Sequence, residues 1–306
     1  MKHIVFHNDV DGVFSAALFA SGTDAFKDMD YVLHAVPTSF RGDKFNDMMS
    51  KINDPLFIFD FQYHAKAGLW IDHHQNDQMG NESIVNEKIC YDNRARSAAG
   101  LVVRYLESLG IQTSSEATKV VRSADMIDSA DYPNLQFIFE DRSSAMVLRS
   151  FFEFSYPSEM MFGRVVEVLV ACELNLEKTL QVLNIDGSYV DAIRDKAVKT
   201  RDKIELYGKV SVIRQKYAYQ YPRYAEYYAT NSKYNVRISD ENKTDFRVSL
   251  TYNKWHGEKN AINIGSYCAS SKIIKRGGGH YNVGGGIVEK AKIDEFLDQF
   301  SEAVGE

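Results

Sequence analysis

The first part of the chain, to about residue 130, repeats one pattern: a short apolar run, then polar residues, then a helix-like stretch. The apolar runs span residues 3–7, 31–36, 56–60 and 69–72, and helix-like stretches include residues 13–20 and 98–109. Nearly continuous apolar runs are typical of parallel strands that are buried on both faces. Because such runs alternate with helices, the pattern predicts an α/β fold with an open parallel sheet.

Three of the predicted strands end in acidic residues or histidines. The first ends in His7-Asn8-Asp9-Val10-Asp11-Gly12, the third in Asp60 and the fourth in Asp72-His73-His74. Open α/β sheets bind ligands beyond the carboxyl ends of their strands, which places these side chains at one edge. Carboxylates and imidazoles that converge there are desolvated and repel one another unless a cation joins them. We therefore expect a metal site.

The residue types indicate which metal binds. His7, Asp9 and Asp11 occupy alternate positions, so on extended backbone their side chains share one face. Imidazole and carboxylate ligands without cysteine suit Mn²⁺ or Mg²⁺ better than a structural zinc, and they suffice for two ions. Two ions about 3.5–4 Å apart would activate a water for in-line displacement at phosphorus. Gly12, followed by a helix, would direct a helix N-terminus at an anion.

Charge and composition exclude several classes of protein. The 306 residues hold 36 Lys and Arg against 42 Asp and Glu, a net charge of −6 that argues against coating duplex DNA. Three separated cysteines indicate reduced thiols. The polar N-terminus lacks the features of a signal peptide, and no apolar run reaches the length of a membrane span. These features predict a cytoplasmic protein with no membrane partner, and they leave the oligomeric state, such as a homodimer, open.

The two halves of the chain differ in charge and pattern. Residues 1–186 hold 16 Lys and Arg against 27 Asp and Glu, whereas residues 187–306 hold 20 against 15. Helical patterns cover residues 137–183, and residues 189–206 carry the alternating charge of an exposed connecting helix. Strand-like runs follow at residues 210–213, 235–238, 246–252 and 261–264, with a closing helix at 292–304. We expect a metal-binding domain (1–186), a linker helix (187–207) and a smaller α/β domain with a mixed sheet (208–306).

A glycine-rich segment stands out in the second half. Gly277-Gly278-Gly279-His280 is followed by Gly284-Gly285-Gly286. Six glycines in ten residues are costly inside a regular element, so the segment predicts backbone that bends sharply or approaches a ligand closely. The alternative is a flexible surface loop. Lys275 and Arg276, directly before the glycines, favour a loop that binds phosphate.

Together these motifs resemble those of the DHH phosphoesterases. The first motif (residues 7–12), Asp60, Asp72-His73-His74 and Ala124-Asp125 occur in the order of the four family motifs. The family includes RecJ-type single-strand exonucleases, the oligoribonucleases called nanoRNases, and family II pyrophosphatases. The glycine segment resembles the Gly-Gly-Gly-His signature of the DHH-associated domain of nanoRNases and related nucleases, whereas pyrophosphatases carry a different second domain.

The resemblance implies a role for each matched residue. Two Mn²⁺ ions, with Mg²⁺ as an alternative, would be bound by His7, Asp9, Asp11, Asp60, His73 and Asp125. Asp60 would bridge the ions, Asp72 would hold His73 in the correct tautomer, and His74 would face the substrate phosphate. Asp128 and Asp131 lie close to Asp125, which the resemblance favours. The substrate would be held, across an interdomain cleft, by Lys275, Arg276, Gly277, Gly278, Gly279 and His280.

The expected function is hydrolysis of phosphoesters in small nucleic-acid substrates. The favoured substrates are very short oligonucleotides or a phosphorylated nucleotide such as 3′-phosphoadenosine 5′-phosphate. One alternative is a RecJ-type single-strand exonuclease, although such enzymes usually carry an additional nucleic-acid-binding module. A second is a non-catalytic nucleotide-binding protein with an inactive metal site. Hydrolysis of pyrophosphate or polyphosphate is disfavoured by the glycine segment.

Overall fold

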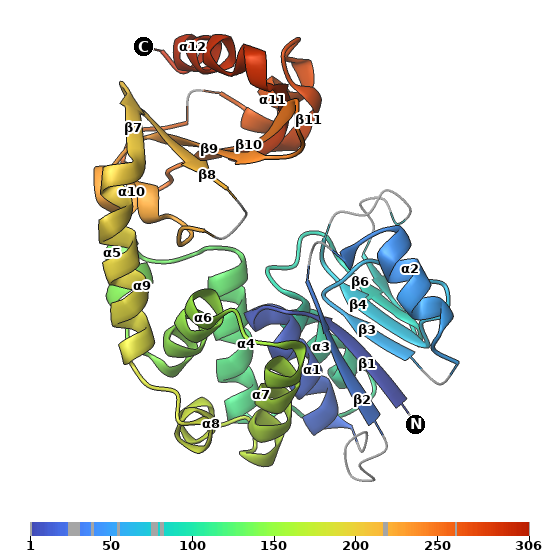
Figure 1. Cartoon of the computed structure of the whole chain (residues 1–306). Helices are drawn as coiled ribbons and strands as arrows, with labels where there is room; N and C mark the ends of the chain where they lie inside the picture. Colours follow the sequence, from blue (N-terminus) through green and yellow to red (C-terminus); the bar gives the residue numbers. More distant parts are fainter. Residues whose placement is uncertain are drawn as a thin grey trace. The chain divides into compact units, whose positions relative to one another are not determined.

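The computed structural model describes residues 2–23, 31–37, 40–53, 56–74, 79, 83–216, 220–260 and 262–305. The chain folds into two α/β units, each with its own sheet, as the sequence predicts (Figure 1). The first unit comprises Met1–Pro133 and Asp141–Tyr189, and the second comprises Asn134–Glu140 and Val190–Glu306. A short helix from the middle of the chain therefore belongs to the second unit.

The sheet of the first unit has, within the described residues, six strands in the order β2-β1-β3-β4-β6-β5. The strands are β1 (Lys2–His7), β2 (Tyr31–Val36), β3 (Leu56–Phe59), β4 (Leu69–Asp72), β5 (Ile84–Val85) and β6 (Ile89–Tyr91). All neighbouring pairs are parallel except β5 with β6. The carboxyl ends of β1, β3 and β4 therefore share one edge, as predicted.

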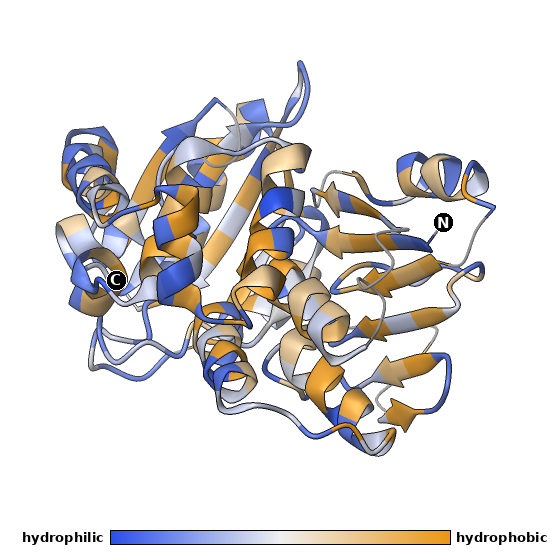
Figure 2. Cartoon of the chain, turned by 90° about the horizontal axis from the view of Figure 1, so that it is seen from below, coloured by the Kyte–Doolittle hydropathy of each residue, from blue (hydrophilic) through white to orange (hydrophobic). Residues whose placement is uncertain are grey.

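Helices cover both faces of this sheet. Phe19 of α1 (Val10–Gly22) packs on Phe57 and Phe59 on one face, while Phe45 of α2 (Asp43–Ser50) joins the hydrophobic cluster on the other. Figure 2 shows that hydrophobic residues dominate the strands, as expected for a sheet covered on both sides. The remaining helices of the unit are α3 (Ala98–Ser108), α4 (Ser115–Asp128), α6 (Ser144–Ser155), α7 (Glu159–Ala171) and α8 (Leu176–Leu183).

Helix α1 is fastened to the end of β1. A Cβ atom at Gly12 would lie 2.1 Å from the carbonyl oxygen of His7, so only glycine lets the first turn of α1 pack on this backbone. Asp9 caps the helix, because its Oδ1 accepts a hydrogen bond of 3.0 Å from the Gly12 N–H. This local packing fixes the positions of the polar residues that follow β1.

The second unit has a mixed sheet in the order β11-β12-β10-β9-β8-β7. Its strands are β7 (Ile204–Tyr207), β8 (Val210–Gln215), β9 (Tyr234–Asp240), β10 (Asp245–Tyr252), β11 (Lys275–His280) and β12 (Val283–Glu289). Among the described strands of this second sheet, only β8 and β9 pair in parallel. Its helices are α5 (Leu135–Glu140), α9 (Ser188–Lys199), α10 (Ala225–Thr230), α11 (Ile264–Ser270) and α12 (Ile293–Ala303), with 3-10 turns at Thr200–Lys203 and Lys290–Lys292. Residues of α11 and α12 build the core with the sheet.

Two predicted elements of the second half differ from the structure. The predicted linker helix stops early, because Ile204–Tyr207 forms the edge strand β7, with Ile204 opposite Ile213 of β8. The strand predicted at 261–264 is wrong, since α11 begins at Ile264. The side chain of Asn263 accepts a hydrogen bond from the Ser266 N–H at 3.0 Å and caps the helix, while Ala261 lies outside the described residues.

The prediction that the glycine segment is a loop is wrong. Its glycines lie in β11 and β12, which form an antiparallel pair with Gly278 opposite Gly285. A Cβ atom at Gly277 would lie 2.0 Å from the carbonyl oxygen of Cys268, because α11 packs directly on the strand backbone. One extra residue bulges from β11 between Lys275 and Gly278, where Arg276 adopts φ +53°. The glycines thus allow a close helix–sheet contact.

The structure also bears on the expectations of reduced cysteines and of no membrane-spanning segment. Cys90, Cys172 and Cys268 are all free thiols. Burial raises the pKa of Cys90 and of Cys268 to about 11, so neither is a reactive thiolate. Within the described parts of the chain, every helix is too short or too polar to cross a membrane.

Candidate metal centre

The ends of β1, β3 and β4 bring histidines and carboxylates together at one edge of the first sheet. Among the described residues, three groups have potential ligand atoms that all lie within 4.8 Å of one another. Asp60 belongs to two of the groups, and so does His73. The groups are His7, Asp9 and Asp60; Asp60, His73 and His74; and Asp11, His73 and Asp128.

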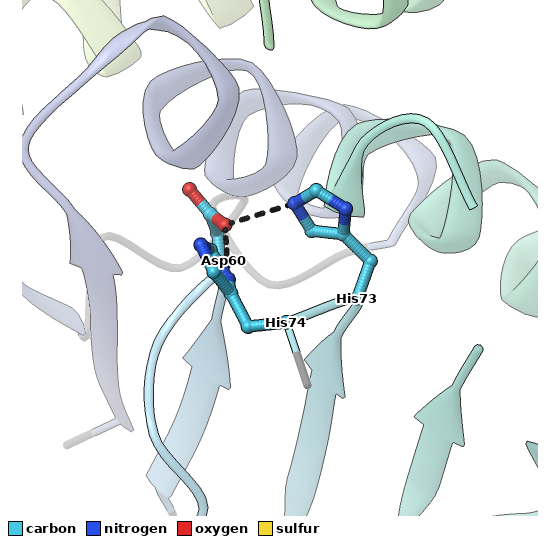
Figure 3. A group of neighbouring side chains, drawn as sticks. All are labelled: Asp60, His73 and His74. Atoms are coloured by element: carbon cyan, nitrogen blue, oxygen red, sulfur yellow. Dashed lines mark ion pairs between the residues drawn. The ribbon is translucent and has the colours of Figure 1, made fainter. Parts of the chain in front are cut away.

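Asp60 lies at the centre of the cluster. Its Oδ2 is 3.5 Å from His7 Nδ1. Its Oδ1 is 3.4 Å from His74 Nδ1 and 3.6 Å from His73 Nε2 (Figure 3). The residue is 0% exposed, and within the described structure neither carboxylate oxygen accepts a hydrogen bond. Burial therefore raises the pKa of Asp60. A buried carboxylate in this state is stabilised by a bound cation.

His7 and Asp9 form one side of the cluster. His7 Nδ1 lies 2.7 Å from Asp9 Oδ2. Burial alone would lower the pKa of His7, but the negative charges of Asp9 and Asp60 outweigh burial and raise it to about 11. His7 is therefore protonated in the metal-free cluster, and binding of a divalent ion by His7 would require loss of that proton.

His73 is oriented by a backbone carbonyl. The carbonyl oxygen of Ala95 can only accept, so the contact of 3.2 Å with His73 Nδ1 requires a proton on Nδ1. His73 Nε2 then faces the carboxylates, at 3.2 Å from Asp128 and 3.6 Å from both Asp11 and Asp60. Burial opposes protonation of His73, but Asp128 and Asp60 raise its pKa to about 12. This arrangement leaves Nε2 as the ligand atom for a metal.

Asp72 holds His74 instead of His73. Asp72 Oδ1 accepts a hydrogen bond from His74 Nδ1 at 2.9 Å and from the backbone N–H groups of His73 at 2.8 Å and His74 at 3.2 Å. The ring that Asp72 orients is therefore that of His74, contrary to the expectation from the resemblance. The His74 side chain is 39% exposed, against 11% for His7 and for His73, so it is the most accessible histidine of the cluster.

Asp11 joins the cluster to helix α3. Its Oδ2 and Oδ1 accept hydrogen bonds from the N–H groups of Ala98 at 2.7 Å and Ala99 at 2.9 Å, at the N-terminus of α3. Burial, followed by the charge of Asp60, raises the pKa of Asp11 well above its usual range. A residue that the sequence singles out for metal binding thus also positions a helix.

The structure places Asp125 and Asp128 differently from the expectation. Asp125 Oδ1 accepts a hydrogen bond of 2.6 Å from Ser97 Oγ, the N-cap of α3, and Asp125 belongs to none of the three ligand groups. Asp128, one turn further along α4, lies 3.2 Å from His73 Nε2. We therefore propose Asp128 as the ligand from α4, with Asp125 holding Ser97 in place.

Replacement of Asp128 by Asn is expected to weaken Mn²⁺ binding more than the same change at Asp125. Loss of a ligand typically costs more than the 10- to 100-fold that is usual for a residue beside the ligands. We expect at least a tenfold difference in the Mn²⁺ dissociation constant between the two variants, measured by calorimetric titration. Equal effects of Asp128→Asn and Asp125→Asn, or a larger effect at Asp125, would reverse the assignment.

The chemistry of the cluster fits divalent cations. Asp9, Asp11, Asp60 and Asp128 supply oxygen donors, and the histidines supply nitrogen donors, with no cysteine among the three groups. Such mixed oxygen and nitrogen donors suit Mn²⁺ and also bind Mg²⁺. The raised pKa values of His7 and His73 show that the cluster attracts positive charge.

No protein-family model matches the chain, and no curated protein matches it. Solved structures do match. The pGpG-specific phosphodiesterase PggH from Vibrio cholerae superposes with a TM-score of 0.67 at 16% identity, and the match covers 99% of both chains. The DHH domain of a member of a ribosomal-protein family gives a TM-score of 0.59 at 14% identity, covering 99% of this chain and 86% of that one. The chain therefore has the fold of the DHH-domain proteins.

The DHH fold extends over both units, since the match to PggH covers nearly the whole of each chain. RecJ from Thermus thermophilus, solved in complex with Mn²⁺, gives a TM-score of 0.57 at 11% identity. This match covers 99% of the present chain and 52% of RecJ, so the chain spans about half the length of that protein. The resemblance found in the sequence motifs is thus confirmed at the level of the fold.

Proposed function

We propose that this protein is a metal-dependent phosphoesterase that cleaves very short oligonucleotides or a phosphorylated nucleotide. The observation that carries the proposal is the set of three overlapping ligand groups around Asp60, at the carboxyl edge of a DHH-fold sheet. The similarity in fold to a pGpG-specific phosphodiesterase along its full length supports a dinucleotide-sized substrate.

The proposed ligands lie in or next to β1, α1, β3, β4 and α4 of the first unit. Two Mn²⁺ or Mg²⁺ ions bound there would supply Lewis-acid activation of water and neutralise charge on the phosphoryl oxygens. Asp60 contacts residues of both sides of the cluster, which makes it the candidate bridging carboxylate. The proposed ligand set is His7, Asp9, Asp11, Asp60, His73 and Asp128.

His74 is the proposed contact to the phosphate that is cleaved. Its Nδ1 is engaged by Asp72, so Nε2 is the ring nitrogen left for a substrate. Burial opposes protonation of His74, but the hydrogen bond and charge of Asp72 raise its pKa. A protonated imidazole donates to a phosphoryl oxygen and stabilises the charge that develops there during displacement. Asp72 acts by positioning and charging His74.

The second unit is proposed to contribute to substrate binding through Arg276 and the glycines that follow it in β11. A Cβ atom at Gly278 would have no heavy atom within 4 Å, so a ligand can reach this backbone. Arg276 is exposed, whereas Lys275 is already paired with Glu289 at 2.8 Å and Asp245 at 3.5 Å. Arg276 is therefore the better candidate cation, and Gly277, Gly278, Gly279 and His280 complete the proposed substrate-binding segment.

A panel of substrates tests the proposal. Purified protein with Mn²⁺ is offered 5′-phosphorylated dinucleotides, a 20-nucleotide single strand, 3′-phosphoadenosine 5′-phosphate and pyrophosphate. We expect the dinucleotides or the phosphorylated nucleotide to turn over fastest, and chelation of the metal to stop the reaction. Faster cleavage of the 20-mer would favour a RecJ-type exonuclease. No metal-dependent turnover of any substrate would favour a nucleotide-binding protein without catalysis.

A further inference from the structure

We propose that Arg41 binds a second phosphate of the substrate, one that is not cleaved; this inference rests on the proposed function. Arg41 follows β2, whose carboxyl end lies at the same sheet edge as the candidate ligands. Its Cζ lies 5.5 Å from the centroid of the Phe61 ring. Phe61 directly follows Asp60, and its ring centroid is 5.9 Å from that of His7. A single aromatic ring thus connects Arg41 with the metal cluster.

The backbone on both sides of Arg41 is fixed. The N–H of Gly42 donates a hydrogen bond of 3.0 Å to Gln62 Oε1, which ties the segment to the residues that follow Asp60. The N–H of Phe40 donates to the carbonyl oxygen of Pro37 at 2.8 Å, and Phe40 packs against the hydrophobic cluster under α2. Arg41 is therefore held beside the site by the same chain segment that carries Asp60.

Arg41 also has its charge available. It is exposed, and within the described part of the chain no carboxylate lies within ion-pair distance of its guanidinium. Two other arginines near this edge are already paired: Arg94 with Asp92 at 3.1 Å and Arg96 with Asp131 at 2.5 Å. A guanidinium that lies over an aromatic face keeps its N–H edge open for a planar, bidentate contact with phosphate.

The charge balance of the metal cluster explains why binding of a second phosphate requires an additional cationic side chain such as Arg41. The four proposed carboxylate ligands balance the charge of two divalent ions, so the loaded site has no excess positive charge for another anion. A 5′-phosphorylated dinucleotide carries a terminal phosphate besides the diester that is cleaved. Arg41 supplies the positive charge for this terminal phosphate, and it makes the enzyme prefer substrates that carry one.

The test compares one dinucleotide with and without a 5′-phosphate. Arg41→Gln is expected to lower kcat/KM for the phosphorylated form by about 10- to 100-fold, mainly through KM, because a charge-assisted contact is lost. The change for the unphosphorylated form is expected to be less than about threefold. Arg41→Lys, which retains the charge without the bidentate geometry, should fall between. Arg164→Gln is the matched control, since Arg164 is 58% exposed on α7 and pairs with Glu167 at 3.3 Å.

Equal losses on both dinucleotides, or no loss on either, would overturn the role of Arg41. If the wild-type protein cleaves neither dinucleotide, the proposed cleavage of short oligonucleotides fails, and the role of Arg41 is then tested by binding alone. Calorimetric titration with Ca²⁺ then compares the dissociation constants of the two dinucleotides without turnover. A preference for the phosphorylated form that disappears in Arg41→Gln supports the inference, whereas the same dissociation constants in wild type and variant contradict it.

Discussion

Replacement of Asp60 by Asn is expected to reduce Mn²⁺-dependent hydrolysis by at least about 100- to 1,000-fold, while the protein remains folded. Asp60 is shared by two of the three ligand groups, so its loss removes the carboxylate at the centre of the cluster. Asn has nearly the same volume and is among the residues that best tolerate left-handed backbone, which Asp60 adopts with φ +55°. Ala at this position would add backbone strain and confuse the comparison.

The control for Asp60→Asn is Asp47→Asn on α2. Asp47 is 67% exposed and pairs with Lys51 at 2.7 Å, so its replacement removes the same charge from the same unit without touching the cluster. Initial rates with Mn²⁺ measure activity, and circular dichroism with thermal unfolding measures folding. If Asp60→Asn retained more than a tenth of wild-type turnover, the assignment of Asp60 as the central ligand would be untenable.

Replacement of Gly277 by Ala is expected to destabilise the second unit by about 3 kcal/mol or more. The added Cβ would lie 2.0 Å from the carbonyl oxygen and 2.6 Å from the carbonyl carbon of Cys268. Both atoms belong to the backbone of α11, so the clash cannot be relieved by rotating a side chain, and the helix must move away from β11. The free energy of unfolding in urea, followed by hydrogen exchange of the α11 amides, measures the effect.

Gly278 provides a control on the neighbouring residue. A Cβ atom there has open space, so Gly278→Ala is expected to change the free energy of unfolding by less than about 0.5 kcal/mol. A fall in activity with stability unchanged would then indicate that the substrate approaches this backbone. Equal stability of Gly277→Ala and Gly278→Ala would show that the close contact with α11 is not what requires the glycine.

The sheet and the convergence of the site were predictable for a general physical reason. Strands buried on both faces must be almost entirely apolar, so the polar residues that end them are conspicuous in the sequence. Parallel strands have their carboxyl ends on one edge, and this geometry brings His7, Asp60 and His73 together whatever the details of packing. The ligand type follows from the residues themselves.

The choice between Asp125 and Asp128 was not predictable in this way. Residues three apart on a helix point in directions about 60° apart and differ by about 4.5 Å along the axis. Which one reaches His73 depends on how α4 is rotated and where it stops, and both are set by its packing against α1 and α3. The sequence also gives no sign that the carbonyl of Ala95 orients His73, because every residue except the last carries such a group.

The glycine segment illustrates a different limit. A glycine that lets a ligand approach the backbone and a glycine that lets a helix pack on a strand are the same residue in a sequence. Gly277 serves the second purpose, because Cys268 of α11 lies against it, whereas Gly278 has open space beside it. Two adjacent glycines of one motif therefore have different structural roles. Only the positions of the surrounding atoms in the folded protein distinguish these roles.

The most direct test of the central claim is hydrolysis of a 5′-phosphorylated dinucleotide in water enriched in ¹⁸O, with Mn²⁺ present. Mass spectrometry of the products reads both the bond that breaks and the origin of the new oxygen. The account predicts two mononucleotides, one of which carries a single ¹⁸O in its phosphoryl group. It predicts no product after chelation of the metal and at least about 100-fold slower product formation in Asp60→Asn. No product from either the dinucleotide or 3′-phosphoadenosine 5′-phosphate in the presence of Mn²⁺, or product formed equally well by Asp60→Asn, would contradict the account.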